Sequence, residues 1–255
     1  MFIIIALMCI FLTLAFHEIG HAIAMHKCGV KITEIGLGMP VGLPHLSFRL
    51  NRWKDIQFTI HPLLLGAYVK PADGETERMK TLSFWDNVFM LCNGVQGNML
   101  FGLLIAAGVL ITKPVITETI WYEFGIVTIL ALLLITFSRA CSKLTLTLIP
   151  ACVMLLVKLA KSSSLDLMGP VGIVQETVNN TPDLHSALNM GFSLSVSLVV
   201  LNLLPICPLD GGKIISFLLE KKFPRIERVY RGLGVATIAI FILEVTGHDI
   251  FRLFK

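Results

Sequence analysis

The sequence has few charged residues and lacks the features of a nucleic-acid-binding protein. Charged residues make up 15% of the 255 positions and hydrophobic residues 55%, and the mean hydropathy is +0.80. A water-soluble protein of this length needs more charge on its surface. The net charge of +4 is small and no stripe of basic and aromatic residues accompanies it, which argues against a nucleic-acid partner. The composition predicts a polytopic α-helical membrane protein.

Paired cysteines are also lacking. The six cysteines are scattered, mostly within apolar segments, and no CxxC pair occurs. They are therefore expected to be apolar packing residues rather than disulfides or thiolate ligands. No basic stretch precedes the first apolar run, so we expect this run to be a retained membrane span rather than a signal peptide.

Apolar runs of membrane-spanning length predict about six transmembrane helices. They cover residues 2–25, 87–111, 120–137, 144–159, 184–205 and 232–246. The basic, amphipathic stretch 213–231 is expected to lie along a membrane surface. No soluble domain is evident, so the chain is treated as one integral-membrane domain with three parts, residues 1–111, 112–167 and 168–255.

Residues 29–71 differ from the apolar runs on either side. Short pieces rich in β-branched and aromatic residues alternate there with Gly and Pro, a pattern typical of strands joined by turns. We expect a small membrane-associated β-element at about residues 30–70. An exposed strand edge there could bind an extended peptide, and a passive surface hairpin is an equally open alternative.

Two histidines and a glutamate stand inside the first apolar run. His17 and His21 are four residues apart, so on a helix their imidazoles share one face and can bind one Zn²⁺, with Glu18 beside them as a general base. Burying these groups in a membrane helix costs free energy, which favours a functional role. The HExxH pattern alone is short, however, and a catalytic zinc site needs a third ligand.

Asp210 is the candidate third ligand. Pro205 and Pro208 end the fifth apolar run, and the pair Gly211 and Gly212 follows, so we expect Asp210 on irregular backbone near membrane depth. Two histidines and one carboxylate leave the fourth zinc position open for water, as in catalytic sites. The alternative is an aspartate that caps a helix beginning near residue 213.

The distribution of Lys and Arg predicts the orientation. The connections 26–81, 138–143 and 212–232 carry sixteen of these residues, and the rest of the chain carries five. Basic connections stay in the cytoplasm, which places the N-terminus outside. His17, His21 and Asp210 then fall at the same depth, towards the cytoplasmic side.

With HEIGH in its first span and NLLPICPLDGG in a late one, the chain resembles the site-2 protease family of intramembrane zinc metalloproteases, in particular the bacterial branch that cleaves membrane-bound anti-sigma factors. The likeness covers residues 1–110 and 168–255. It implies a multi-pass protein of the inner membrane, in contact with lipids, that acts on single-pass transmembrane proteins. It also implies that His17, His21 and Asp210 bind Zn²⁺. Glu18 would then be the general base. The resemblance further implies that Asn98 and Asn202 position the substrate.

Some positions depart from the family pattern. Val95 stands where the Gly-Pro-x-x-Asn signature has Pro, the order of Cys207 and Pro208 is unusual, and Ser197 replaces a frequent Asn. Two predicted spans stand where close relatives carry PDZ domains.

Two alternatives stay open: a membrane-anchored zinc peptidase acting on soluble segments, and a non-proteolytic membrane scaffold or transporter with a structural zinc site.

Overall fold

The computed structural model describes residues 2–38, 40–49, 55–62, 66–112, 137–161 and 182–253, together with five positions between 172 and 179. The helices are α1 (Phe2–Lys27), α2 (Glu75–Thr81), α3 (Phe84–Thr112), α5 (Arg139–Thr147), α6 (Ile149–Lys161), α8 (Leu184–Asn202), α9 (Asp210–Lys222) and α10 (Pro224–Leu253). The strands are β1 (Ile32–Leu37), β2 (Leu46–Arg49), β3 (Gln57–Ile60) and β4 (Ala67–Pro71).

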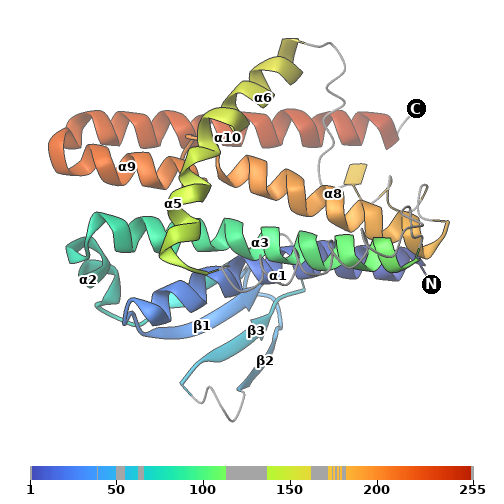
Figure 1. The fold of residues 1–255 in the computed structure, drawn as a ribbon, viewed down its shortest axis with the longest axis horizontal. Coiled ribbons are helices and arrows are strands. Elements are labelled where there is room, and N and C mark those ends of the chain that lie inside the picture. The colour runs from blue at the N-terminus through green and yellow to red at the C-terminus, as the bar shows by residue number, and fades with distance from the viewer. Residues whose placement is uncertain are drawn as a thin grey trace, which may run out of the picture.

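A bundle of long helices forms the body of the molecule. The central helix α3 packs along both α1 and α8, α9 and α10 form a hairpin beside them, and α5 crosses α3 (Figure 1). Within the described residues, four helices are long and apolar enough to cross a membrane: Phe2–Lys27, Phe84–Val109, Leu184–Asn202 and Pro224–Gly247. The chain is thus mainly helical, as its composition predicts.

The predicted spans at 2–25, 87–111 and 184–205 correspond to α1, α3 and α8. The last predicted span begins earlier than expected, because α10 starts at Pro224 and includes part of the basic stretch. The prediction of one span over 144–159 is not confirmed: α5 ends at Thr147 and the 13-residue α6 follows. Pro150 in the first turn of α6 explains the break, since proline is compatible with a helix start but not its interior. The predicted span at 120–137 lies outside the described residues except for its last position.

Close contact between α1 and α3 depends on small residues. A Cβ atom added to Gly20 of α1 would lie 2.0 Å from the carbonyl oxygen of Asn93 on α3. Farther along the same two helices, Cys9, Phe101 and Ile105 form a buried apolar cluster. The two backbones therefore approach each other closely at the HEIGH segment, as small residues allow in membrane helices.

The predicted β-element is a four-stranded mixed sheet in the order β2-β3-β1-β4. β1 pairs in parallel with β3 and antiparallel with β4, so that Ile35 lies opposite both Phe58 and Val69. These side chains pack with Ile32 against Ala22 of α1. One face of the sheet thereby covers the end of α1 that follows His21.

Polar side chains join strands on the other face. The Tyr68 hydroxyl donates to Glu34 Oε1 at 2.7 Å and lies 3.1 Å from His61 Nε2. Partial burial and the Glu34 carboxylate raise the pKa of Tyr68 to about 12, so the hydroxyl stays protonated. These contacts tie β1, β4 and the end of β3 together.

The junction between α5 and α6, which we call the elbow (residues 148–152), packs into the bundle. It belongs to an apolar cluster shared with α3 and with the end of α8: Leu148, Ile149, Cys152, Val95, Leu203 and Leu204. Near the start of α5, Gln96 of α3 accepts from the Phe137 amide at 3.0 Å and donates to Ser142 Oγ at 2.8 Å. Polar and apolar contacts together fix α5 across α3.

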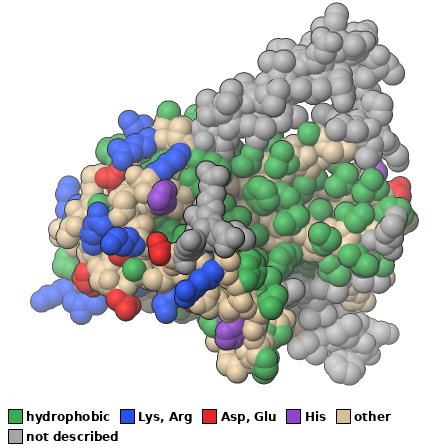
Figure 2. Space-filling view, turned by 90° about the horizontal axis from the view of Figure 1, so that it is seen from below, with side chains coloured by type: hydrophobic (Ala, Val, Ile, Leu, Met, Phe, Trp, Pro, Cys, Tyr) green, Lys and Arg blue, Asp and Glu red, His purple; other side chains and the backbone are tan. Residues whose placement is uncertain are grey.

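Charged side chains gather at one end of the molecule. Figure 2 shows Lys and Arg concentrated at the end where α2 and the turn between α9 and α10 lie, with hydrophobic side chains covering the middle of that face. This separation of a basic end from an apolar body fits a protein that lies in a membrane with one end at its surface.

Candidate metal centre

The two histidines of α1 point to one spot. His17 and His21 lie one helical turn apart, their rings meet edge to face, and their Nε2 atoms are 3.1 Å apart. Both residues are 9% exposed. The i, i+4 spacing thus gives the arrangement expected from the helical repeat.

Asp210 completes a triangle with the histidines, although it is almost two hundred residues away in sequence. Its Oδ2 atom lies 3.2 Å from Nε2 of His17 and 3.2 Å from Nε2 of His21. Asp210 is 3% exposed, and among the described residues its Oδ2 atom has no hydrogen-bond partner. A buried carboxylate oxygen that faces two imidazole nitrogens and lacks a hydrogen bond fits a metal-binding position.

The size of this triangle suits zinc. Bonds of 2.0–2.1 Å in a tetrahedral site put the ligand atoms about 3.3 Å from one another. The three sides of the observed triangle are 3.1, 3.2 and 3.2 Å. Three ligands of this kind leave one tetrahedral position for water or substrate.

The backbone of α3 fixes the protonation of His21. Its Nδ1 atom lies 2.8 Å from the carbonyl oxygen of Met90. A carbonyl only accepts, so Nδ1 carries the proton and Nε2 keeps its lone pair for a metal. His21 is therefore held in the form that a metal ligand requires.

Asn98 supports His17 in a similar way. Its side-chain amide lies 3.1 Å from His17 Nδ1, and with Nδ2 towards the ring its buried Oδ1 has no hydrogen-bond partner among the described residues. The amide turned by 180° accepts from Nδ1–H through Oδ1. That arrangement satisfies the oxygen and leaves His17 Nε2 free, so metal binding selects it. Asn98 thus lies behind a histidine; its predicted role towards substrate stays a prediction.

A glycine of α3 makes room for both imidazoles. A Cβ atom at Gly94 would lie 2.4 Å from His21 Nε2 and 2.8 Å from His17 Cε1. No other residue type leaves this space, because every other side chain begins with a Cβ. α3 therefore provides the space for the two imidazoles as well as the groups that form hydrogen bonds with them.

The backbone at Asp210 is more regular than predicted. Residues 203–209 form the turn after α8, and Asp210 is the first residue of α9 rather than part of an irregular segment. Gly211 and Gly212 lie within the first turn of α9, where added Cβ atoms would come within 2.4 Å of the backbone at residues 203–207. The two glycines are therefore explained by close packing of α9 against the preceding turn, and not by a need for backbone flexibility.

Two charged groups adjoin the ligands. Lys213 Nζ donates to Asp210 Oδ1 at 3.0 Å. Glu18, the predicted base, is partly buried and interacts electrostatically with His21 and Lys213. Within the described residues, Asn202 makes no hydrogen bond or ion pair with this cluster; its Nδ2 donates to the Leu198 carbonyl of its own helix.

Sequence reasoning missed the two supports that complete the site. Met90 contributes only its carbonyl group, which no side-chain pattern reveals. Lys213 was predictable from its spacing, since residues three apart on a helix are neighbours, but it was grouped with the basic surface stretch. The roles assigned to His17, Glu18, His21 and Asp210 remain predictions that this geometry supports.

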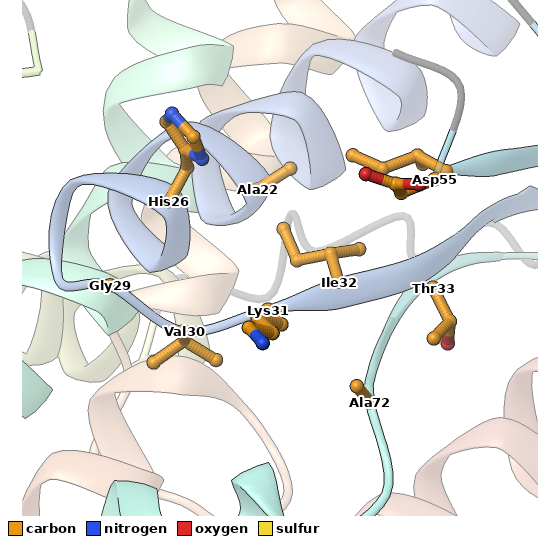
Figure 3. A pocket seen from close by; sticks show the side chains of 10 residues that line it. Ala22, His26, Gly29, Val30, Lys31, Ile32, Thr33, Asp55 and Ala72 are labelled. Atoms are coloured by element: carbon orange, nitrogen blue, oxygen red, sulfur yellow. The ribbon is translucent and has the colours of Figure 1, made fainter.

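A cavity of about 830 Å³ lies beyond the ligands, between the end of α1 and the sheet. Figure 3 shows five of the residues that line it: Ala22 and His26 on α1, and Lys31, Ile32 and Thr33 around the start of β1. Ala22 follows His21 directly in the sequence. The cavity is therefore next to the metal-binding turn of α1, on the side of the sheet.

Comparison with known families decides the classification. The model of peptidase family M50 matches residues 5–243. The chain belongs to peptidase family M50. This confirms the resemblance to site-2 proteases, which the HEIGH and Asp-Gly-Gly segments suggest; the anti-sigma-factor branch and the absence of PDZ domains stay predictions.

Two relatives of this M50 chain are named zinc metalloprotease RasP. The protein of Geobacillus kaustophilus is 33% identical over 94 residues, which cover 34% of this chain and 22% of that protein. The protein of Bacillus licheniformis is 37% identical over 99 residues, or 36% of this chain and 23% of that protein. The chain spans less than a third of the length of the curated relatives that it matches.

Proposed function

We propose that this chain is an intramembrane zinc metalloprotease that cleaves transmembrane segments of single-pass membrane proteins, as in regulated intramembrane proteolysis. The observation that carries the proposal is the convergence of His17, His21 and Asp210, whose ligand atoms all lie within 4.8 Å of one another among apolar helices. Membership of family M50 and the names of its relatives support the same activity.

Each residue of the centre has a distinct task in this mechanism. His17, His21 and Asp210 would hold Zn²⁺, which would supply Lewis-acid polarisation of the scissile carbonyl and lower the pKa of a water. Glu18 would act as the general base for the attacking water and would pass the proton to the leaving amine. Asn98 and the Met90 carbonyl keep the two imidazoles in the tautomer that binds metal.

The substrate must present an extended backbone. A transmembrane helix buries its carbonyl groups in internal hydrogen bonds, so cleavage requires local unwinding. The sheet offers two edges, β2 and β4, on which an unwound segment can form an added strand. We favour the β4 edge, because Val69 of β4 packs with Ala22, the residue after His21.

The proposed location is the inner membrane, with the N-terminus outside and the metal centre towards the cytoplasm. Sixteen Lys and Arg residues in three connections against five elsewhere support this orientation. The basic end seen in Figure 2 would then face the cytoplasm. The cavity of Figure 3 lies at the end of α1 that follows the HEIGH segment, so it would open towards the same side.

The decisive experiment compares purified wild-type protein with Glu18→Gln on a panel of single-pass transmembrane peptides in detergent. We expect about one zinc per chain in both, and a cleavage rate at least ~100-fold lower in the variant, because a general base contributes 10²–10⁴-fold. Glu77→Gln is a matched control, since Glu77 is exposed and pairs with Lys80.

Normal cleavage by Glu18→Gln would show that the role given to Glu18 is wrong. Zinc in both proteins without cleavage of any peptide would favour the scaffold or transporter alternative. Absence of zinc from both would overturn the metal centre itself.

A further inference from the structure

We propose that Lys213 is a positioning residue that keeps Asp210 a ligand through one oxygen only. The inference rests on the proposed zinc centre and concerns the coordination number of the metal. The two oxygens of the Asp210 carboxylate have separate surroundings: Oδ1 receives a hydrogen bond from Lys213 Nζ at 3.0 Å, and Oδ2 faces the two histidines at 3.2 Å.

The helix dipole does not favour Lys213 at its position, and its local support is the i, i+3 ion pair with Asp210. Lys213 lies in the first turn of α9, where the helix dipole disfavours a positive charge. Its side chain is 51% exposed, whereas the Asp210 side chain is 4% exposed. A half-exposed lysine thus reaches inwards to a buried carboxylate.

The hydrogen bond determines which oxygen meets the metal. A carboxylate free to rotate can bind zinc through both oxygens and occupy two positions. With Oδ1 held by Lys213, only Oδ2 remains directed at the point where the histidine nitrogens meet. Three protein atoms and one water then make a four-coordinate centre.

This arrangement matters because zinc peptidase centres accept a fifth atom during the reaction. Zinc in catalytic sites can expand from four to five ligands in the transition state. If Asp210 bound through both oxygens, it would fill the place that a substrate carbonyl needs. Lys213 therefore reserves a coordination position for substrate.

Glu18 makes the same lysine a neighbour of the proposed base. Lys213 interacts electrostatically with both Asp210 and Glu18. One positive charge is thus within electrostatic range of two carboxylates with different tasks, and its hydrogen bond goes to the carboxylate that would bind the metal. We infer that the primary effect of Lys213 is on Asp210 geometry.

The test uses the full chain with Co²⁺ in place of zinc, because the visible absorption of Co²⁺ is intense in four-coordinate sites and weaker in five-coordinate sites. We expect Lys213→Met to bind about one Co²⁺ and to lose intensity per bound ion. Lys213→Arg, which retains a charged donor, should keep the wild-type spectrum. Lys222→Met should also keep it.

The absorbance is divided by the amount of bound Co²⁺, so that only chains with a folded metal site contribute to the measured intensity. Lys213→Ala provides a second variant if Lys213→Met folds poorly. A spectrum of Lys213→Met or Lys213→Ala equal to wild type would overturn the role of Lys213 while leaving the metal centre intact. Failure of the wild-type chain to bind Co²⁺ or zinc would overturn both the centre and this inference.

Discussion

The histidine side of the metal centre is held by a second long helix, whereas the aspartate side is held by contacts around a helix break. On the histidine side, α3 supplies the Met90 carbonyl, the Asn98 amide and the space at Gly94. On the aspartate side, Asp210 opens α9 just after a turn, and a half-exposed Lys213 holds its second oxygen.

A further contact on the aspartate side comes from α10. The Tyr230 hydroxyl donates to the Pro205 carbonyl at 2.8 Å, and the Gly212 carbonyl lies 3.4 Å away. Tyr230 thus bridges the turn before Asp210 and the first turn of α9. The direction of the ligand atoms is therefore fixed by buried groups on the histidine side, whereas on the aspartate side it depends on how α9 and α10 pack.

The largest effect on zinc binding is expected at Gly94, where the two imidazoles leave no space for a side chain. Gly94→Ala would place a methyl group 2.4 Å from His21 Nε2, so the imidazoles must move apart. We expect loss of zinc during dialysis against a weak chelator, measured by metal analysis. Gly108→Ala is the control on the same helix, since its nearest contact would be Leu188 Cδ1 at 3.6 Å. Full zinc content in Gly94→Ala would mean that α3 does not constrain the histidines.

An intermediate effect is expected from the hydrogen bond behind His17. Asn98→Ala removes the group that orients this ring, and such partners change metal affinity by about 10–100-fold. Zinc Kd measured by chelator competition should rise by that factor. Asn98→Asp keeps an acceptor oxygen and should lose less. If Asn98→Ala bound zinc as tightly as wild type, the role of Asn98 in orienting His17 would be refuted. The control is Asn87→Ala, which loses hydrogen bonds to the Met79 and Ser83 carbonyls instead.

The smallest effect is expected on the aspartate side. Tyr230→Phe removes one hydrogen bond, a loss of about 1 kcal/mol, so zinc Kd should rise at most about fivefold. Thr237→Val serves as a control, because it removes a hydroxyl of α10 that donates only within the helix, to Leu233. A larger increase in zinc Kd for Tyr230→Phe than for Asn98→Ala, measured by the same competition assay, would show that the aspartate side is the more tightly constrained of the two.

The parts of the fold that depend on sequence pattern were predictable. Long apolar runs correspond to α1, α3 and α8, and the β-branched pieces between residues 29 and 71 form the sheet. The grouping of His17, His21 and Asp210 was also predictable, because ionisable groups in apolar runs need partners. The break between α5 and α6 could have been inferred from Pro150 but was missed.

Other features could not be predicted because they depend on tertiary contacts. The sequence does not show that the Met90 carbonyl meets His21, since every residue carries a carbonyl. The direction of the Asn98 amide, towards His17, depends on how α1 and α3 face each other. For Asp210, the prolines indicated a break but not the residue at which the next helix begins.

The elbow between α5 and α6 connects the two sides mechanically. Leu148, Ile149 and Cys152 share one apolar cluster with Val95, beside Gly94, and with Leu203 and Leu204, shortly before Asp210. Tightly packed clusters transmit displacement instead of absorbing it. A displacement of the elbow would therefore reach residues next to both groups of ligands at once.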